Sequence, residues 1–200
     1  MNSQFDDYKR ISTLDFANNK KQLALSYLIR LIGVAVFTLL FVAIIRVFHP
    51  ELPATLGTFF NIGLEGASQL VSYLLVAVSV VLVLLLHELV HAAVFYLDQH
   101  VPPQIGWRGL TIFAAAPGFL STRKSMVINA LAPFTVISIL GLTLIAILPV
   151  DWVSWIFIPI MVNAAAAGGD FMTVVWLRKL PEDAKIEDNG DVLTAYAEEQ

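Results

Sequence analysis

The segment HELVH, residues 87–91, places two histidines four residues apart and a glutamate directly after the first. On an α-helix, residues four apart lie on one face, so His87 and His91 point in the same direction while Glu88 flanks them. This is the spacing of the HExxH zinc motif, in which the imidazoles bind the ion and the carboxylate accepts a proton from water. The spacing therefore predicts Zn2+ as the cofactor, with His87 and His91 as ligands and Glu88 as general base.

The surroundings of this motif strengthen the prediction. Residues 70–86 carry no charge and continue directly into the motif. An ionisable side chain in the middle of a membrane helix costs about 2.5 to 3.5 kcal/mol on insertion scales, so each such group needs a partner. Zinc is one partner, and hydrogen bonding within a helix bundle is the alternative. Because the chain has no cysteine, a metal must be held by His, Asp or Glu, and a cysteine nucleophile is excluded.

A catalytic zinc site needs a third protein ligand and one open position. Asp170, in the stretch NAAAAGGDF, is the sole acid in the last apolar segment, and we expect it at the same depth as the histidines. The small residues before it would let a neighbouring helix approach closely; an ion pair with an arginine is the alternative. Asn163, on about the same face, could bind substrate or orient a ligand, although an ordinary interhelical hydrogen bond is the simpler expectation. We expect Asn129 to make a polar packing contact.

The elements that must position these residues are long and apolar. Hydrophobic residues make up 58% of the 200 residues and charged residues only 14%, an excess that a soluble domain could hardly bury. Since a span needs about 20 apolar residues, four helices are expected. They lie near residues 25–48, 70–97, 126–150 and 152–177. The sequence thus predicts an all-α integral membrane protein of about four transmembrane helices, with a short β-hairpin-like loop between the second and third.

The basic residues predict an orientation. Lysines and arginines lie before the first span, between the second and third, and after the fourth, whereas residues 50–69 contain none. The positive-inside rule then places both termini and the hairpin loop in the cytoplasm. Arg30 and Arg46 bracket the first span and can extend toward the lipid headgroups. His49 and His100 fall in expected loops, where a surface position is the default.

Two regions outside the spans have distinct compositions. In the inner loop, Arg108 and Gly109 are expected to form the turn of the hairpin. Residues 181–200 hold seven acids and one base, and we expect them to form a solvated, partly disordered cytoplasmic tail. No basic cluster suggests binding to nucleic acid.

Together these residues resemble a known family. HELVH, the strand-like loop, LAP in the third span and GGD in the fourth are similar to intramembrane zinc metalloproteases of the site-2 protease type, and more closely to the bacterial membrane zincin peptidases. The resemblance implies that His87, His91 and Asp170 bind zinc, that Glu88 is the general base, and that the hairpin receives an extended substrate strand. The chain departs from site-2 proteases in having Gly-Gly-Asp-Phe without a neighbouring proline.

The expected function is therefore a zinc-dependent endopeptidase, with residues 1–180 as its membrane metallopeptidase domain. It would hydrolyse peptide bonds near the cytoplasmic face of a bacterial cell membrane, with a membrane protein or peptide as substrate and the lipid bilayer as its surroundings. Two alternatives remain at this point: a non-proteolytic binding or regulatory protein that retains the site, and a metal or ion carrier.

Overall fold

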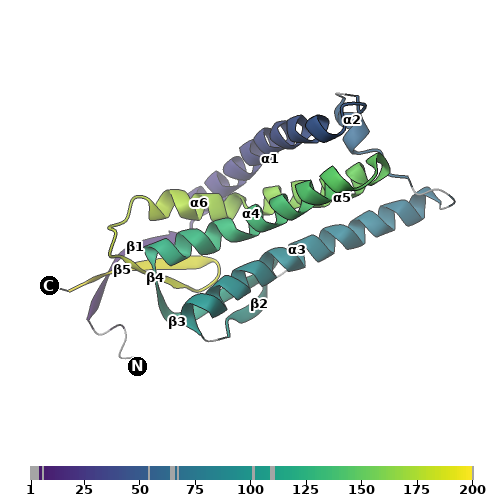
Figure 1. Ribbon diagram of the computed structural model, residues 1–200. Helices are drawn as coiled ribbons and strands as arrows, with labels where there is room; N and C mark the ends of the chain where they lie inside the picture. The colour runs from purple at the N-terminus through teal and green to yellow at the C-terminus, as the bar shows by residue number, and fades with distance from the viewer. Residues whose placement is uncertain are drawn as a thin grey trace.

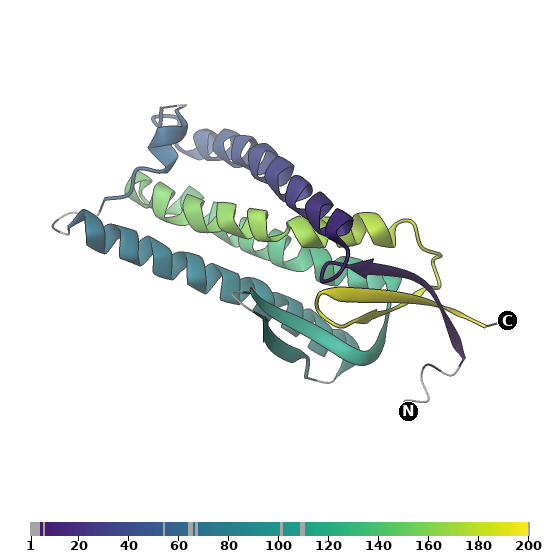
Figure 2. The same cartoon turned by 180° about the vertical axis from the view of Figure 1, so that it is seen from behind.

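The computed structural model describes residues 5, 7–53, 55–63, 66, 68–100, 102–108 and 111–199. Its helices form an elongated bundle with a small sheet at one end, and both termini lie at that sheet end (Figures 1 and 2). The helices are α1 (Lys20–Phe48), α2 (Leu56–Phe59), α3 (Gln69–Gln99), α4 (Arg123–Ile147), α5 (Val153–Ala166) and α6 (Gly168–Leu177), with a 3-10 turn at Val150–Trp152.

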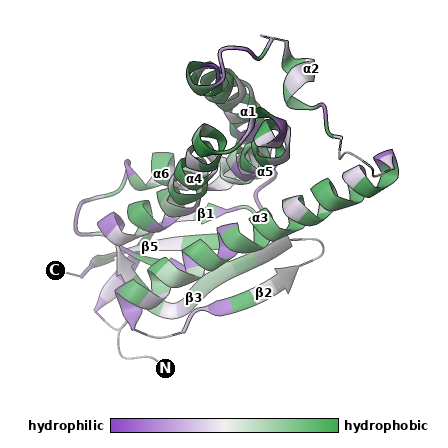
Figure 3. Cartoon of the chain, turned by 45° about the vertical axis from the view of Figure 1, so that its right-hand side comes forward, coloured by the Kyte–Doolittle hydropathy of each residue, from purple (hydrophilic) through white to green (hydrophobic). Residues whose placement is uncertain are grey.

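The long helices begin at residues whose side chains cap them. Asn19 accepts hydrogen bonds from the first backbone amides of α1, Ser68 accepts one from α3, and Thr122 accepts one from α4. These caps satisfy amides that lack a partner within the helix. Most of the residues that follow in α1 and α3 are hydrophobic, as the colouring by hydropathy shows (Figure 3).

Four segments of the described chain are long and apolar enough to cross a membrane: Lys20–Phe48, Gln69–Gln99, Arg123–Ile147 and Val150–Leu177. They coincide with the four predicted spans to within a few residues. The fourth is divided, because α5 ends at Ala166 and α6 begins at Gly168. The bundle places α4 and α5 between α1 on one side and α3 on the other (Figures 1 and 2).

The prediction of an all-α fold is wrong. Five strands form one antiparallel sheet in the order β1-β5-β4-β3-β2. Their bounds are Tyr8–Asp15 for β1, Gln104–Arg108 for β2, Thr111–Thr122 for β3, Lys185–Asp188 for β4 and Val192–Glu198 for β5. Only the β2–β3 hairpin was expected from the sequence. Of its two predicted turn residues, Arg108 is instead the last residue of β2 and pairs with Thr111, and Gly109 lies outside the described residues.

The supposed acidic tail supplies two of these strands. Ile186, Leu193 and Ala195 alternate with polar residues and are buried against Leu14 of β1 and Leu177 of α6. The high density of acids obscured this pattern, because Lys185, Glu187 and Asp188 surround the one buried aliphatic residue of β4 and are themselves half-buried. Residues 185–198 therefore belong to the folded core and are not a disordered end.

Two hydrophobic clusters hold the molecule together. One joins the sheet to the adjacent ends of the helices and includes Phe95, Met126 and Leu177. The other fills the bundle further from the sheet and includes Phe41 and Phe157. The candidate functional site lies between these two clusters.

Candidate metal centre

Helix α3 positions the histidines of HELVH. His87 and His91 are 3% and 8% exposed, and their rings lie with centroids 5.0 Å apart in an edge-to-face arrangement. The one-turn spacing places both rings on the face of α3 that meets α4 and α5. The two histidines are thus brought together as the spacing predicts.

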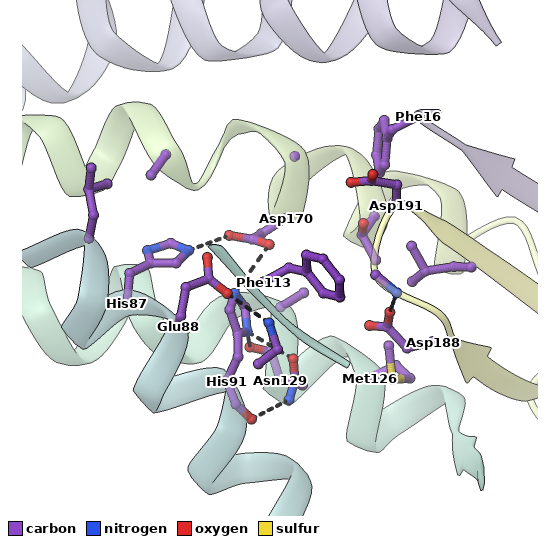
Figure 4. Close-up of a pocket in the computed structure, with 18 of the residues that line it drawn as sticks. Phe16, His87, Glu88, His91, Phe113, Met126, Asn129, Asp170, Asp188 and Asp191 are labelled. Atoms are coloured by element: carbon purple, nitrogen blue, oxygen red, sulfur yellow. Dashed lines mark hydrogen bonds and ion pairs between the residues drawn. The ribbon is translucent and has the colours of Figure 1, made fainter. Parts of the chain in front are cut away.

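Asp170 reaches the same point from the first turn of α6. Its Oδ2 lies 3.2 Å from Nε2 of His87, and its Oδ1 lies 3.5 Å from Nε2 of His91. One ligand atom from each of the three residues can be chosen so that all lie within 4.8 Å of one another. Figure 4 shows the three side chains pointing toward a common centre. The structure therefore brings together the three residues that the sequence singled out as ligands.

Two asparagines hold the other nitrogen of each imidazole. Nδ1 of His87 lies 2.9 Å from Oδ1 of Asn163, and Nδ1 of His91 lies 2.9 Å from Oδ1 of Asn129. Asn129 also donates from Nδ2 to the backbone carbonyl of His91 at 3.1 Å, which fixes the orientation of its amide. Because a carbonyl oxygen only accepts hydrogen bonds, each Nδ1 carries the proton in this arrangement.

This hydrogen bonding fits the site for a cation. With Nδ1 protonated, a neutral imidazole presents a lone pair at Nε2, and both Nε2 atoms face the Asp170 carboxylate. Oδ2 of Asp170 is buried and has no hydrogen-bond partner among the described residues. Lone pairs that converge in this way repel one another unless a positive ion lies between them. Two nitrogens and one carboxylate are a donor set that suits zinc.

Glu88 lies beside the three candidate ligands and is held by the sheet. The backbone amide of Ala114 in β3 donates to its Oε2 at 3.1 Å. Glu88 and the three candidate ligands all line one cavity of about 550 Å³. The same cavity extends past Phe113 to the β4–β5 turn, where Asp188 lies (Figure 4).

Two consecutive glycines shape the opposite wall. A Cβ at Gly168 would lie 2.7 Å from Cβ and 2.8 Å from Cα of Arg30, so only glycine lets α1 approach α6 this closely. At Gly169, which lines the cavity, a Cβ would meet nothing within 4 Å. The close helix approach expected from the small residues before Asp170 is therefore present at Gly168.

Several residues near the site were not found by sequence reasoning, or were found with another role. Asn163, considered as a substrate-binding residue, is completely buried and directs its carbonyl oxygen at His87. Asn129, expected only to pack, meets His91. Asp188 comes from the supposed tail, and burial raises the pKa of its carboxyl to about 7. The long sequence separation of these residues from HELVH left no local pattern by which to connect them.

Comparison with known proteins identifies the family. The model of a family described as "Putative zincin peptidase" matches residues 80–185, just over half of the chain. The chain belongs to this zincin peptidase family. The matched region of this zincin runs from within α3 to the start of β4, so it contains both histidines, Glu88 and Asp170. No curated protein and no solved structure matches the zincin. Membership implies zinc as the metal, in agreement with the donor set of the site.

Proposed function

We propose that this zincin is a zinc-dependent endopeptidase of the HExxH type that hydrolyses peptide bonds in or close to a membrane. His87, His91 and Asp170 hold the zinc, and Glu88 is the general base. The observation that carries the proposal is the convergence of two Nε2 lone pairs and one carboxylate beside Glu88 in a single cavity. Zinc at such a site supplies a Lewis acid, which polarises the scissile carbonyl and lowers the pKa of water toward about 7.

The protein's own residues then have defined tasks. Asn163 and Asn129 hold the two imidazoles in the tautomer that leaves Nε2 free. Glu88 takes one proton from the attacking water as the water oxygen bonds to the carbonyl carbon. When the carbon–nitrogen bond breaks, Glu88 passes that proton to the leaving amine. The second proton of the water then leaves the new carboxyl group for the amine, so the products are a carboxylate and a protonated amine. The amide of Ala114 holds the Glu88 carboxylate in place between these steps.

The sheet supports a site-2-protease-like way of binding substrate. The first residues of β3 pair with β2, for example Ala114 with Ile105, while the described pairing of β3 with β4 begins only at Ala116. The edge of β3 that bears the Ala114 amide is therefore directed at Glu88 and not at another strand. An extended peptide could lie along this edge, with the Ala114 amide still engaged by Glu88, and place a backbone carbonyl near the zinc site. A helical substrate would have to unwind first, because its peptide bonds are already hydrogen-bonded.

The position of the site supports action at depth within a bilayer. His91 and His87 lie 8 and 12 residues before the end of α3 at Gln99, or about 12 and 18 Å of helix rise. Val81, Leu84 and Leu85 of the same apolar helix line the cavity. With the sheet end in the cytoplasm, as the basic residues at that end favour, the site lies toward the cytoplasmic face of a bacterial cell membrane. The partners are then the lipid bilayer and a membrane protein or peptide substrate.

The decisive experiment replaces the general base. We would purify the protein in mild detergent with zinc and measure cleavage of a library of internally quenched peptides, together with the zinc content of each sample. Glu88→Gln should lower cleavage by about 100-fold or more, because general base catalysis contributes that much, and should retain zinc. Glu199→Gln, at an exposed glutamate beyond β5, is the matched control and should leave both unchanged.

Two results would contradict the proposal. Cleavage by Glu88→Gln at the wild-type rate would rule out this mechanism. A folded wild-type protein that binds zinc but cleaves no peptide, in the library or in membrane protein extracts, would make it a non-proteolytic zinc protein.

A further inference from the structure

Arg30 of α1 lies in the wall of the candidate active-site cavity. From the sequence it was expected to extend toward lipid headgroups at one end of the first span. It lies 10 residues after Lys20, the start of α1 at the sheet end, or about 15 Å of helix rise. This depth falls between those of His91 and His87 in α3, so the arginine is level with the candidate metal ligands.

Close packing fixes the backbone of Arg30 next to the helix that carries Asp170. Its Cα and Cβ lie against Gly168, where an added Cβ would come within 2.8 and 2.7 Å of them. Gly168 and Asp170 belong to the same first turn of α6. Arg30 therefore enters the cavity from the side of the metal ligand Asp170, opposite α3.

The charge of Arg30 is poorly compensated. Its Nε is buried without a hydrogen-bond partner among the described residues, and its guanidinium carbon lies 5.4 Å from the ring centroid of Tyr27. Among the described residues that line the cavity, it is the one Lys or Arg. A guanidinium stays charged at any physiological pH, and leaving one short of partners in an apolar setting is costly. A guanidinium with an unpartnered Nε in a cavity wall fits a site that an anionic ligand completes.

Arg30 shares the cavity wall with four carboxylates, those of Glu88, Asp170, Asp188 and Asp191. Asp170 is paired with the two histidines, and among the described residues no ion pair joins Arg30 to Glu88, Asp170 or Asp188. During peptide hydrolysis, negative charge develops on the carbonyl oxygen as water adds to the carbon. A guanidinium presents N–H donors in a planar fork that suits such an oxygen or a carboxylate.

We propose that Arg30 is a substrate-binding residue that donates hydrogen bonds to an anionic oxygen of the substrate beside the metal. The inference rests on the proposed peptidase function. The oxygen has two sources of the same chemistry: the scissile carbonyl as it becomes an oxyanion, or the terminal carboxylate of a peptide. The depth of Arg30 beside Asp170 favours the first.

Binding of two probes tests this inference without turnover. The first is acetyl-Leu-Leu amide in which a phosphinate replaces the peptide bond between the leucines, so that the phosphinate is its sole anion. The second is acetyl-Leu-Leu with a free terminal carboxylate, compared with the same peptide as its amide. For this probe each protein also carries Glu88→Gln, so that the peptide is not cleaved during the measurement. Calorimetry would give the affinities for zinc-loaded wild type, Arg30→Gln, Arg30→Lys and the control Arg46→Gln, an exposed arginine in the last turn of α1.

We expect Arg30→Gln to weaken phosphinate binding by about 10- to 100-fold, the usual contribution of hydrogen bonds to a charged group. Arg30→Lys keeps the charge and should fall between wild type and Arg30→Gln, which keeps the test valid if Arg30→Gln folds poorly. Arg46→Gln should stay within about twofold of wild type. Zinc content should be the same in all four proteins. Loss of affinity for the free carboxylate alone would support the inference with the terminal carboxylate as the source.

The inference is overturned if zinc-loaded wild type does not bind the phosphinate and Glu88→Gln protein does not bind the free carboxylate. It is also overturned if the Arg30 variants bind both probes as Arg46→Gln does. Failure of the proposed function has a different result, since wild-type protein would then lack zinc or would not cleave peptides.

Discussion

Buried histidines occur at two levels of the helix bundle, and they differ in how their two ring nitrogens are used. His49, just after α1 and far from the sheet, is 9% exposed; its Nε2 lies 2.8 Å from the carbonyl of Ile145 and its Nδ1 lies 3.1 Å from Glu51. His87 and His91 meet an asparagine oxygen at Nδ1 and turn Nε2 toward Asp170. A buried histidine is thus available to a metal only where the fold leaves one nitrogen facing other ligands.

The expectation that His49 lies on the surface of a loop is wrong for a related reason. It bridges the end of α1 to the end of α4, through a carbonyl that is 96 residues away in the sequence. Neither the neighbours of His49 nor its spacing in the sequence indicates that the Ile145 carbonyl is its partner. Three measurements test this difference between His49 and the histidines of the candidate site: bound zinc, zinc affinity and the pH dependence of stability.

The largest effect is expected on bound zinc when one of the candidate ligands is removed. His87→Ala or Asp170→Ala should reduce bound zinc from about one per chain to almost none, because two remaining ligands hold zinc weakly. His49→Ala should retain zinc, since both nitrogens of His49 are engaged elsewhere. Elemental analysis of the purified proteins measures this. Zinc retained without His87, or lost without His49, would refute the distinction between His49 and the two site histidines.

An intermediate effect is expected from the asparagines that set the tautomers. Asn163→Ala and Asn129→Ala should each weaken zinc binding by about 10- to 100-fold while leaving all three ligands in place. Competition with a chromophoric chelator gives the affinities. Asn18→Ala, at an exposed asparagine that contacts Asp15, is the control. Unchanged affinity in both site variants would mean that the hydrogen bonds at Nδ1 do not prepare the ligands.

The smallest effect concerns pH and stability at His49. The hydrogen bond to the Ile145 carbonyl raises the pKa of His49 above its usual value, and Glu51 acts in the same direction. The stabilisation is therefore complete below the unfolded pKa of about 6.5 and is lost as pH rises through the higher folded pKa. Thermal unfolding of wild type and His49→Gln in detergent should show a difference that shrinks with rising pH. Each kcal/mol corresponds to about 2 to 4 °C in Tm.

The control for this test is Glu51→Gln, which should reduce the pH dependence without removing it, because the carbonyl contact is the larger cause. A difference between wild type and His49→Gln that stays constant from below pH 6 to above pH 8 would contradict the assignment.

Sequence reasoning located the site better than it located the fold. His87, Glu88 and His91 share one helical turn, and Asp170 is a lone acid in an apolar segment, so short patterns identified them. The sheet has no such pattern. Outside the β2–β3 and β4–β5 hairpins, its strands pair across long sequence separations: β1 and β5 pair Tyr8 with Glu198, and β4 has only four residues, three of them charged. The partners of the site residues were hidden for the same reason, since Asn129 and Asn163 are polar residues whose importance depends on which helix they face.

The strand order also determines when the sheet can be completed during synthesis. In the sheet, β5 lies between β1 and β4, and β1 pairs with no other described strand. During synthesis, β1 must therefore wait until residues 192–198 have left the ribosome, long after the histidines have been translated. The β4–β5 turn, which contributes Asp188 and Gly190 to the cavity wall, closes at the same late moment. A nascent chain thus carries His87, Glu88, His91 and Asp170 for some time before the cavity around them is complete.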